Sequence, residues 1–160
     1  MDLKTVKMNI PEGANIILGQ THFIKTAEDL YEAITGTSSS AKFGLAFSEA
    51  SGDCLIRLEG NDPELVEAAS KISQALACGH TFVVLLKGAF PINILNTIKN
   101  VQEVCSIFCA TANPVEVVVA ETDQGRGIMG VIDGYPPKGV EDASKMQERR
   151  NLLRRFGYKL

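Results

Sequence analysis

Apolar residues that recur at every second position predict strands along much of this chain. We expect about eight strands, at residues 3–10, 15–18, 43–49, 54–59, 81–87, 104–111, 115–121 and 127–132. Three of them, at 81–87, 104–111 and 115–121, are apolar enough to lie at the centre of a sheet.

A repeat of apolar residues every three to four positions predicts four helices, at residues 26–36, 63–78, 91–99 and 141–156. The second is the best defined, because Asp62 is a capping residue type and Pro63 suits the first helical position. Gly79 is the expected left-handed residue at its end. Strands and helices alternate without an internal repeat or a linker. We therefore expect one layered α/β domain over residues 1–160, with a mixed sheet of parallel and antiparallel strands.

The strand expected at 43–49 has two unequal faces. One face carries large apolar side chains, and the other carries Gly44, Ala46 and Ser48. A row of small residues allows either the backbone of a helix or a ligand to come close to the strand. The sequence leaves both alternatives open.

Composition and charge exclude several classes of protein. The net charge of −3 does not indicate the positively charged surface with which proteins bind nucleic acid. No run approaches the ~18 apolar residues of a membrane span, and residues 1–8 lack the core of a signal peptide. We expect a cytoplasmic protein that binds neither nucleic acid nor membranes. The four cysteines lack C-x-x-C spacing, so we expect free thiols and no metal site made from Cys and His.

The two histidines are the first candidates for chemistry. His80 follows the expected end of a helix and precedes a buried strand, a place where α/β proteins often position functional groups. His22 lies in a polar loop with Gln20, Lys25 and Thr26, next to a helix N-terminus whose free N–H groups favour anions. A structural histidine and a solvated turn with an ordinary Thr26 cap are the alternatives.

A glycine motif, G-x-G-x-x-G, occupies residues 125–130. In a dinucleotide-binding fold this motif opens a helix, but here it lies between two expected strands, so that interpretation fails. Two interpretations of the motif remain, a glycine-rich hairpin that covers phosphates and a flexible β-turn. Arg126 and Gly127 belong to the motif, and a guanidinium in such a loop can hold a phosphate.

Acids and amides follow several of the expected strands. They are Glu49, Asn93, Asn113, Glu121 and Asp133. Hard oxygen ligands beside a fixed positive charge are what a Mg²⁺–phosphate site requires. Each of these residues is also an ordinary surface or turn residue, and Asn113 before Pro114 is a common turn signal.

Together these motifs resemble those of the adenosine-specific kinase family. The resemblance covers almost the whole chain. It rests on the strings GQTHFIKTAEDLY (19–31), FGLAFSEASG (43–52), GHTFVV (79–84), PINILN (91–96), IFCATANP (107–114), GRGI (125–128), VIDG (131–134) and GYK (157–159). It implies a three-layer α/β fold with helices flanking the sheet. It also implies adenosine and adenine nucleotides as ligands, and a homo-oligomer for which we expect a trimer.

The resemblance further implies an ATP-dependent kinase that passes phosphate to adenosine through a phosphohistidine. That histidine falls most naturally on His80, with His22 as the alternative, and Asp133 or Glu49 would hold Mg²⁺ or accept a proton. The residues expected to bind ATP and Mg²⁺ are Gln20, Lys25, Thr26, Glu49, Asn93, Asn113, Arg126 and Gly127. A non-catalytic adenine-nucleotide sensor, or a carrier of phosphohistidine, is the alternative function.

Overall fold

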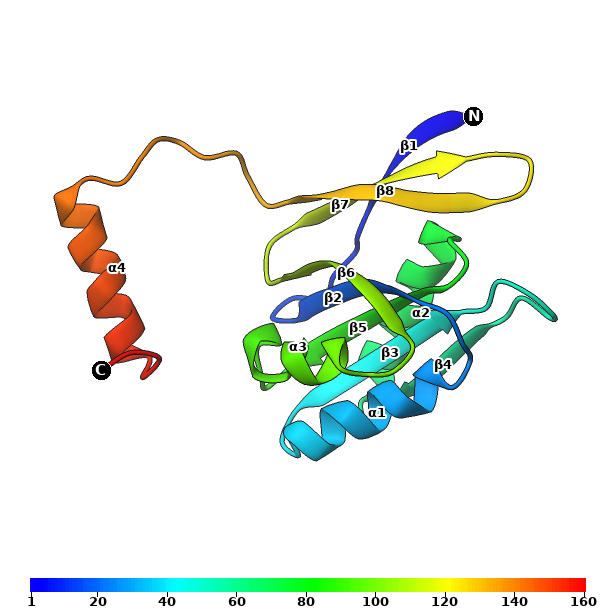
Figure 1. Ribbon diagram of the computed structural model, residues 1–160, viewed down its shortest axis with the longest axis horizontal. Coiled ribbons are helices and arrows are strands. Elements are labelled where there is room, and N and C mark those ends of the chain that lie inside the picture. Colours follow the sequence, from blue (N-terminus) through cyan, green and yellow to red (C-terminus); the bar gives the residue numbers. More distant parts are fainter.

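The computed structural model describes all residues from Met1 to Leu160 (Figure 1). It contains eight strands and four helices in the order β1 (Asp2–Lys7), β2 (Asn15–Thr21), α1 (Thr26–Thr37), β3 (Lys42–Ser48), β4 (Ile56–Gly60), α2 (Pro63–Leu76), β5 (Thr81–Lys87), α3 (Pro91–Lys99), β6 (Val104–Thr111), β7 (Val115–Glu121), β8 (Arg126–Asp133) and α4 (Ala143–Arg155). The α/β character predicted from the periodicity is confirmed.

The strands form two sheets, with the orders β1-β7-β8 and β4-β3-β5-β2-β6. Every pair of neighbouring strands is antiparallel, so the predicted mixed sheet is wrong. The reason is that each of the helices α1, α2 and α3 joins two strands that run in the same direction but are not neighbours. A third strand of opposite direction lies between them, and local sequence patterns do not record that insertion.

Both faces of the five-stranded sheet are covered. On one face, Leu30 and Ile34 of α1 and Ile94 and Ile98 of α3 pack on buried strand residues. On the other face, α2 and the sheet β1-β7-β8 enclose a second apolar cluster (Figure 1). Because β2, β3 and β5 are buried on both faces, each contains a continuous run of apolar residues and glycine, at residues 16–19, 43–47 and 82–86.

The small residues of β3 face α2. A Cβ atom built on Gly44 would lie 2.1 Å from the backbone nitrogen of Val66 and 2.2 Å from the carbonyl carbon of Leu65. The helix backbone therefore occupies the space above this flat strand face. Of the two alternatives that the sequence left open, the close helix is the one that the fold contains.

Helix α2 begins as predicted and ends earlier. The Asp62 carboxylate accepts a hydrogen bond from the N–H of Leu65, and Pro63 is the first helical residue. The helix stops at Leu76, and Ala77 takes the left-handed conformation that was expected of Gly79. Gly79 is instead required for packing, because a Cβ there would lie 2.9 Å from the Cβ of Ala50.

The C-terminal part of the chain departs from the body. After β8, residues 134–142 run outward and lead to α4, which stands apart from the rest of the chain (Figure 1). No residue of α4 is buried. No helix in the structure is long and apolar enough to cross a membrane.

Candidate functional site

Three strands meet at His80. Its N–H donates to the carbonyl of Ser48 at the end of β3 (2.8 Å), and its carbonyl accepts from the N–H of Thr21 at the end of β2 (2.9 Å). The half-buried imidazole lies over the ring of Phe47, with centroids 6.1 Å apart and planes 25° from parallel. Phe47 points toward the α1 side of the sheet, as do Phe43 and Leu45 two and four residues earlier.

The backbone of His80 is held in an uncommon conformation. Its φ of +55° lies in the left-handed region, where few residues other than glycine are found. Such strain persists only where the surroundings impose it, and it is concentrated at functional sites. Here the two hydrogen bonds to β2 and β3 hold the backbone of His80, and the stacking on Phe47 is the contact that its ring makes.

The loop that carries His22 lies beside His80, because Thr21 bonds directly to the His80 backbone. Thr26 braces this loop from within: its hydroxyl bonds to the carbonyl of Phe23 and shares a hydrogen bond with the Thr21 hydroxyl. Thr26 is therefore inside α1, and the predicted role as its N-cap is wrong. His22 and Phe23 remain exposed, and Gln20 is exposed on β2 next to them.

A charged cluster, formed by Lys25, Asp29 and Glu103, lies at the start of α1. The Lys25 ammonium bonds to the Asp29 carboxylate and, at 2.9 Å, to Glu103 Oε1. The bond from Lys25 holds the pKa of Asp29 below its usual range, and the two carboxylates raise the pKa of Lys25. The Glu103 side chain is only 3% exposed, and its Oε2 has no hydrogen-bond partner. A buried carboxylate with a free oxygen is a candidate ligand or base that no sequence motif indicated.

Replacing Lys25 with Met is expected to destabilise the fold at neutral pH, because it leaves the buried Glu103 carboxylate without a compensating charge. Lys71→Met, which breaks the exposed pair with Glu67, is the matched control and is expected to change little. Thermal melts compare the two. Adding Glu103→Gln to Lys25→Met should recover part of the loss, and no recovery would contradict the charge explanation.

The lowered pKa of Asp29 makes the stability of the fold depend on pH. The ion pair with Lys25 stabilises the fold above about pH 4, and this stabilisation is lost at lower pH as the carboxylate is protonated.

Arg126 lies on the other side of the sheet, where a cavity of about 550 Å³ separates the turn after β3 from the β7–β8 hairpin. Residues 49, 79 and 125–127 are among those that line it. The Arg126 guanidinium bonds to the Glu121 carboxylate (2.5 Å) and to the carbonyl of Ala75 in the last turn of α2 (3.4 Å). It therefore occupies the position in which a cation stabilises a helix C-terminus.

Of the two other predicted ligands near this cavity, Glu49 has a role within the fold and Gly127 has none. Glu49 accepts from the N–H of Leu55 and from Arg57, and these bonds hold its pKa below the usual range. Gly127 has no atom within 4 Å of an added Cβ, so the chain itself does not require a glycine there.

Asp133, Asn113 and Asn93 lie at the opposite end of the strands. The Asp133 carboxylate accepts from Thr111 (2.8 Å) and from Asn113 (3.1 Å), while the Asn93 side chain caps α3 by accepting from the N–H of Phe90. Arg126 contacts Cys78, two residues before His80, and Arg126 and Asp133 are the first and the last of the eight residues of β8. Seven steps of ~3.3 Å place them about 23 Å apart. Within one chain, Asp133 therefore lies too far from His80 to act in the same site.

Comparison with known proteins identifies the family. A family model described as adenosine specific kinase matches residues 6–159. A crystal structure of the PH1918 protein from Pyrococcus horikoshii OT3 is similar over 99% of this chain and 98% of that one, with 42% sequence identity and a TM-score of 0.95. No curated protein matches the sequence. Because the family model spans almost the whole chain, this protein belongs to the adenosine-specific kinase family.

Proposed function

We propose that this protein transfers phosphate from ATP to adenosine through a phosphohistidine, and that His80 carries the phosphate. The observation that supports His80 is its backbone, which is held at φ +55° between β2 and β3 with the ring stacked on Phe47. A preorganised ring can attack without first losing rotational freedom. His22 is the alternative, since it lies in the adjoining loop and is exposed.

The proposed reaction has two steps, one onto the histidine and one from the histidine to adenosine. A ring nitrogen of neutral His80 attacks the γ-phosphorus of ATP, the bond to the β,γ-bridging oxygen breaks, and ADP leaves. The 5′-hydroxyl of adenosine then attacks the phosphohistidine, the N–P bond breaks, and AMP forms. The hydroxyl proton passes to a base and the imidazole is restored. The sum is ATP plus adenosine giving ADP plus AMP.

Phosphoryl transfer depends mainly on positioning and on charge neutralisation, which Lys25 would supply in the loop of His22. The first amides of α1 do not contribute, because those of Thr26 and Ala27 donate to the carbonyls of Phe23 and Ile24. The chain has no cluster of three or more His, Cys, Asp or Glu side chains that could enclose a metal. Magnesium generally binds through one or two carboxylates and the phosphates of the nucleotide, and Glu103, whose Oε2 has no hydrogen-bond partner, would be the carboxylate to hold it here. When bound, Mg²⁺ would neutralise charge on the phosphates.

The structure changes the candidates for the proton acceptor. Asp133 lies at the far end of the strands, and Glu49 is engaged with Arg57. The carboxylates beside the His22 loop are Asp29 and Glu103, so these replace Asp133 and Glu49 in the proposal. Glu103 is the stronger candidate because one of its oxygens has no partner.

Incubation with ATP labelled in the γ-phosphate tests the function. The protein is expected to take up label that is lost in acid and kept in alkali, as a phosphohistidine behaves, and to release it as labelled AMP when adenosine is added. Label that stays on the protein in the presence of adenosine would instead support a phosphate carrier or sensor. The absence of any label, together with a melting temperature unchanged by ATP or adenosine, would reject both functions.

A further inference from the structure

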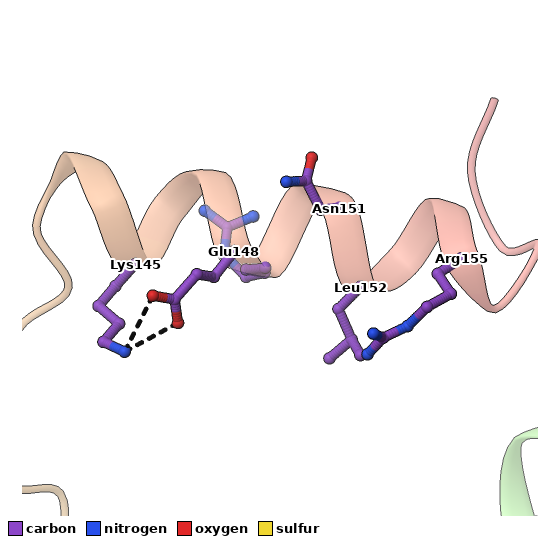
Figure 2. Close-up of a pocket in the computed structure, with 6 residues that line it drawn as sticks. Lys145, Glu148, Asn151, Leu152 and Arg155 are labelled. Carbon is purple, nitrogen blue, oxygen red and sulfur yellow. Dashed lines mark hydrogen bonds and ion pairs between the residues drawn. The ribbon is translucent and has the colours of Figure 1, made fainter.

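The hollows near the C-terminus differ in how many segments of the chain enclose them. One lies along α4 alone, and no other element packs against the residues that Figure 2 labels there: Lys145, Glu148, Asn151, Leu152 and Arg155. The other, a cavity of about 540 Å³, is enclosed by the first turn of α3, by the segment that follows α4, and by the start of β2 and the end of β6. Its volume is that of a small-molecule site.

The sides of this cavity are apolar and rich in aromatic rings. Four of its side chains are large and exposed: Phe90, Ile92, Phe156 and Tyr158 are 62%, 65%, 62% and 46% exposed. Aromatic rings pack well on other flat rings, so the cavity favours an aromatic molecule. No Lys, Arg, Asp or Glu lines it. A phosphate or carboxylate would therefore lose its water there without gaining a partner, which favours an uncharged molecule.

Asn15 is a buried polar side chain of this cavity. It is only 6% exposed, and its Oδ1 has no hydrogen-bond partner. The other buried polar side chain, Thr111, differs because its hydroxyl donates to Asp133 at 2.8 Å. Ile17, two residues after Asn15 on the same face of β2, belongs to the apolar cluster beneath α1 and α3. For folding alone, an apolar residue would suit position 15 better than an unpaired amide.

The chemistry of an amide indicates what would bind Asn15. Buried amides without a partner are costly, and most bind a ligand or a water molecule. One water occupies about 30 Å³, a small part of this cavity, and would leave the aromatic rings in contact with solvent. The amide carries an acceptor beside a donor, and turning it over exchanges the two. Its complement is therefore a ligand edge that also has a donor beside an acceptor.

We propose that this cavity binds an uncharged aromatic ring with an amide-like edge, which pairs with the Asn15 amide while the ring packs against Phe90 and Phe156. The site is separate from the proposed phosphate transfer. Asn15 pairs with Leu86, and Leu86 lies six residues after His80, about 20 Å at ~3.3 Å per residue. The test measures binding and not phosphate transfer, so either proposal can fail without the other.

Nicotinamide is a suitable probe, because it is aromatic, uncharged at neutral pH and carries a primary amide. Titrated into the isotopically labelled full chain and followed by NMR, it is expected to bind with a Kd of roughly 1 mM, a reasonable value for so small a ligand. The side-chain NH₂ signals of Asn15, identified by their absence from the Asn15→Leu variant, should shift as the probe binds.

Asn15→Leu also separates binding from folding, because leucine is close in shape to asparagine and lacks its polar atoms. The variant is expected to bind nicotinamide at least roughly 10-fold more weakly. It should melt at the same temperature as the unmodified chain or higher, since an unpaired buried amide has been removed. Methyl nicotinate, which has the ring but no N–H donor, should bind both chains with about equal, weaker affinity.

Phe156→Ala removes one side of the cavity and is expected to weaken nicotinamide binding roughly 5-fold or more. Phe23→Ala is the matched control, since it truncates a ring that is 53% exposed outside the cavity, and it should bind as the unmodified chain does. The proposal would be overturned if the Asn15 signals did not shift at about 20 times the expected Kd. Unchanged affinity in Asn15→Leu, equal weakening by the two phenylalanine variants, or equally tight binding of the charged acid nicotinate would also overturn it.

Discussion

The variant His80→Asn is expected to take up no phosphate from labelled ATP, a loss of at least about 1,000-fold. An amide cannot serve as the phosphate nucleophile, so the first step of the proposed reaction would be removed. Asparagine is the appropriate replacement because it tolerates the left-handed backbone that His80 adopts. The variant should therefore keep its fold, and its melting temperature should show this.

The control for this experiment is His22→Asn, made and labelled in parallel. If His80 carries the phosphate, the His22 variant retains its label, with a reduced rate only if the loop also positions ATP. The opposite pattern, with label on the His80 variant and none on the His22 variant, would move the phosphohistidine to His22. Loss of label in both variants, with both folded, would indicate that the two rings act in one site.

Gly44→Ala is expected to cost about 3 kcal/mol or more of unfolding free energy. The added methyl group would lie 2.1 Å from the Val66 nitrogen and 2.2 Å from the Leu65 carbonyl carbon, and both are backbone atoms that cannot rotate away. To accommodate it, α2 must move off β3. That movement would open the apolar cluster that α2 shares with Leu85 and Ala46. Chemical denaturation followed by circular dichroism measures the effect.

Gly36→Ala provides a matched control with the opposite sign. Gly36 lies in α1 and has no atom within 4 Å of an added Cβ. Alanine favours the helix by about 0.5–1 kcal/mol over glycine, so this variant should be slightly more stable. If Gly44→Ala were as stable as the unmodified protein, the close packing of α2 on β3 would be wrong.

Much of the local structure could be predicted from the sequence because the signals are local. Helix α3 occupies the predicted residues, as do the strands β5, β6 and β7. Helix α2 starts at the predicted Pro63, since a proline and a capping aspartate act within one turn. Its end was placed two residues too late because Ala77, and not Gly79, adopts the left-handed conformation.

The candidate site was only partly predictable. Both histidines were indicated by their positions, and the structure brings their loops together through the bond between Thr21 and His80. Glu103 was missed because its partner Lys25 is 78 residues away, and nothing in its neighbourhood distinguishes it from a surface acid. Asp133 and Asn113 were grouped with His80 because all follow or precede strands, although they lie at opposite ends of those strands.

The sequence by itself determined the number, type and order of the strands and helices and their approximate bounds. Its motifs also indicated the adenosine-specific kinase family. Only the tertiary structure decided that neighbouring strands in both sheets are antiparallel, that a helix covers Gly44, and that α4 stands apart from the rest of the chain. Periodicity and capping depend on neighbours within a few residues, whereas strand order and the contacts of a buried carboxylate depend on groups far apart in the chain. The packing around His80 also depends on groups far apart in the chain, because its backbone is held by bonds to β2 and β3 at the start of β5.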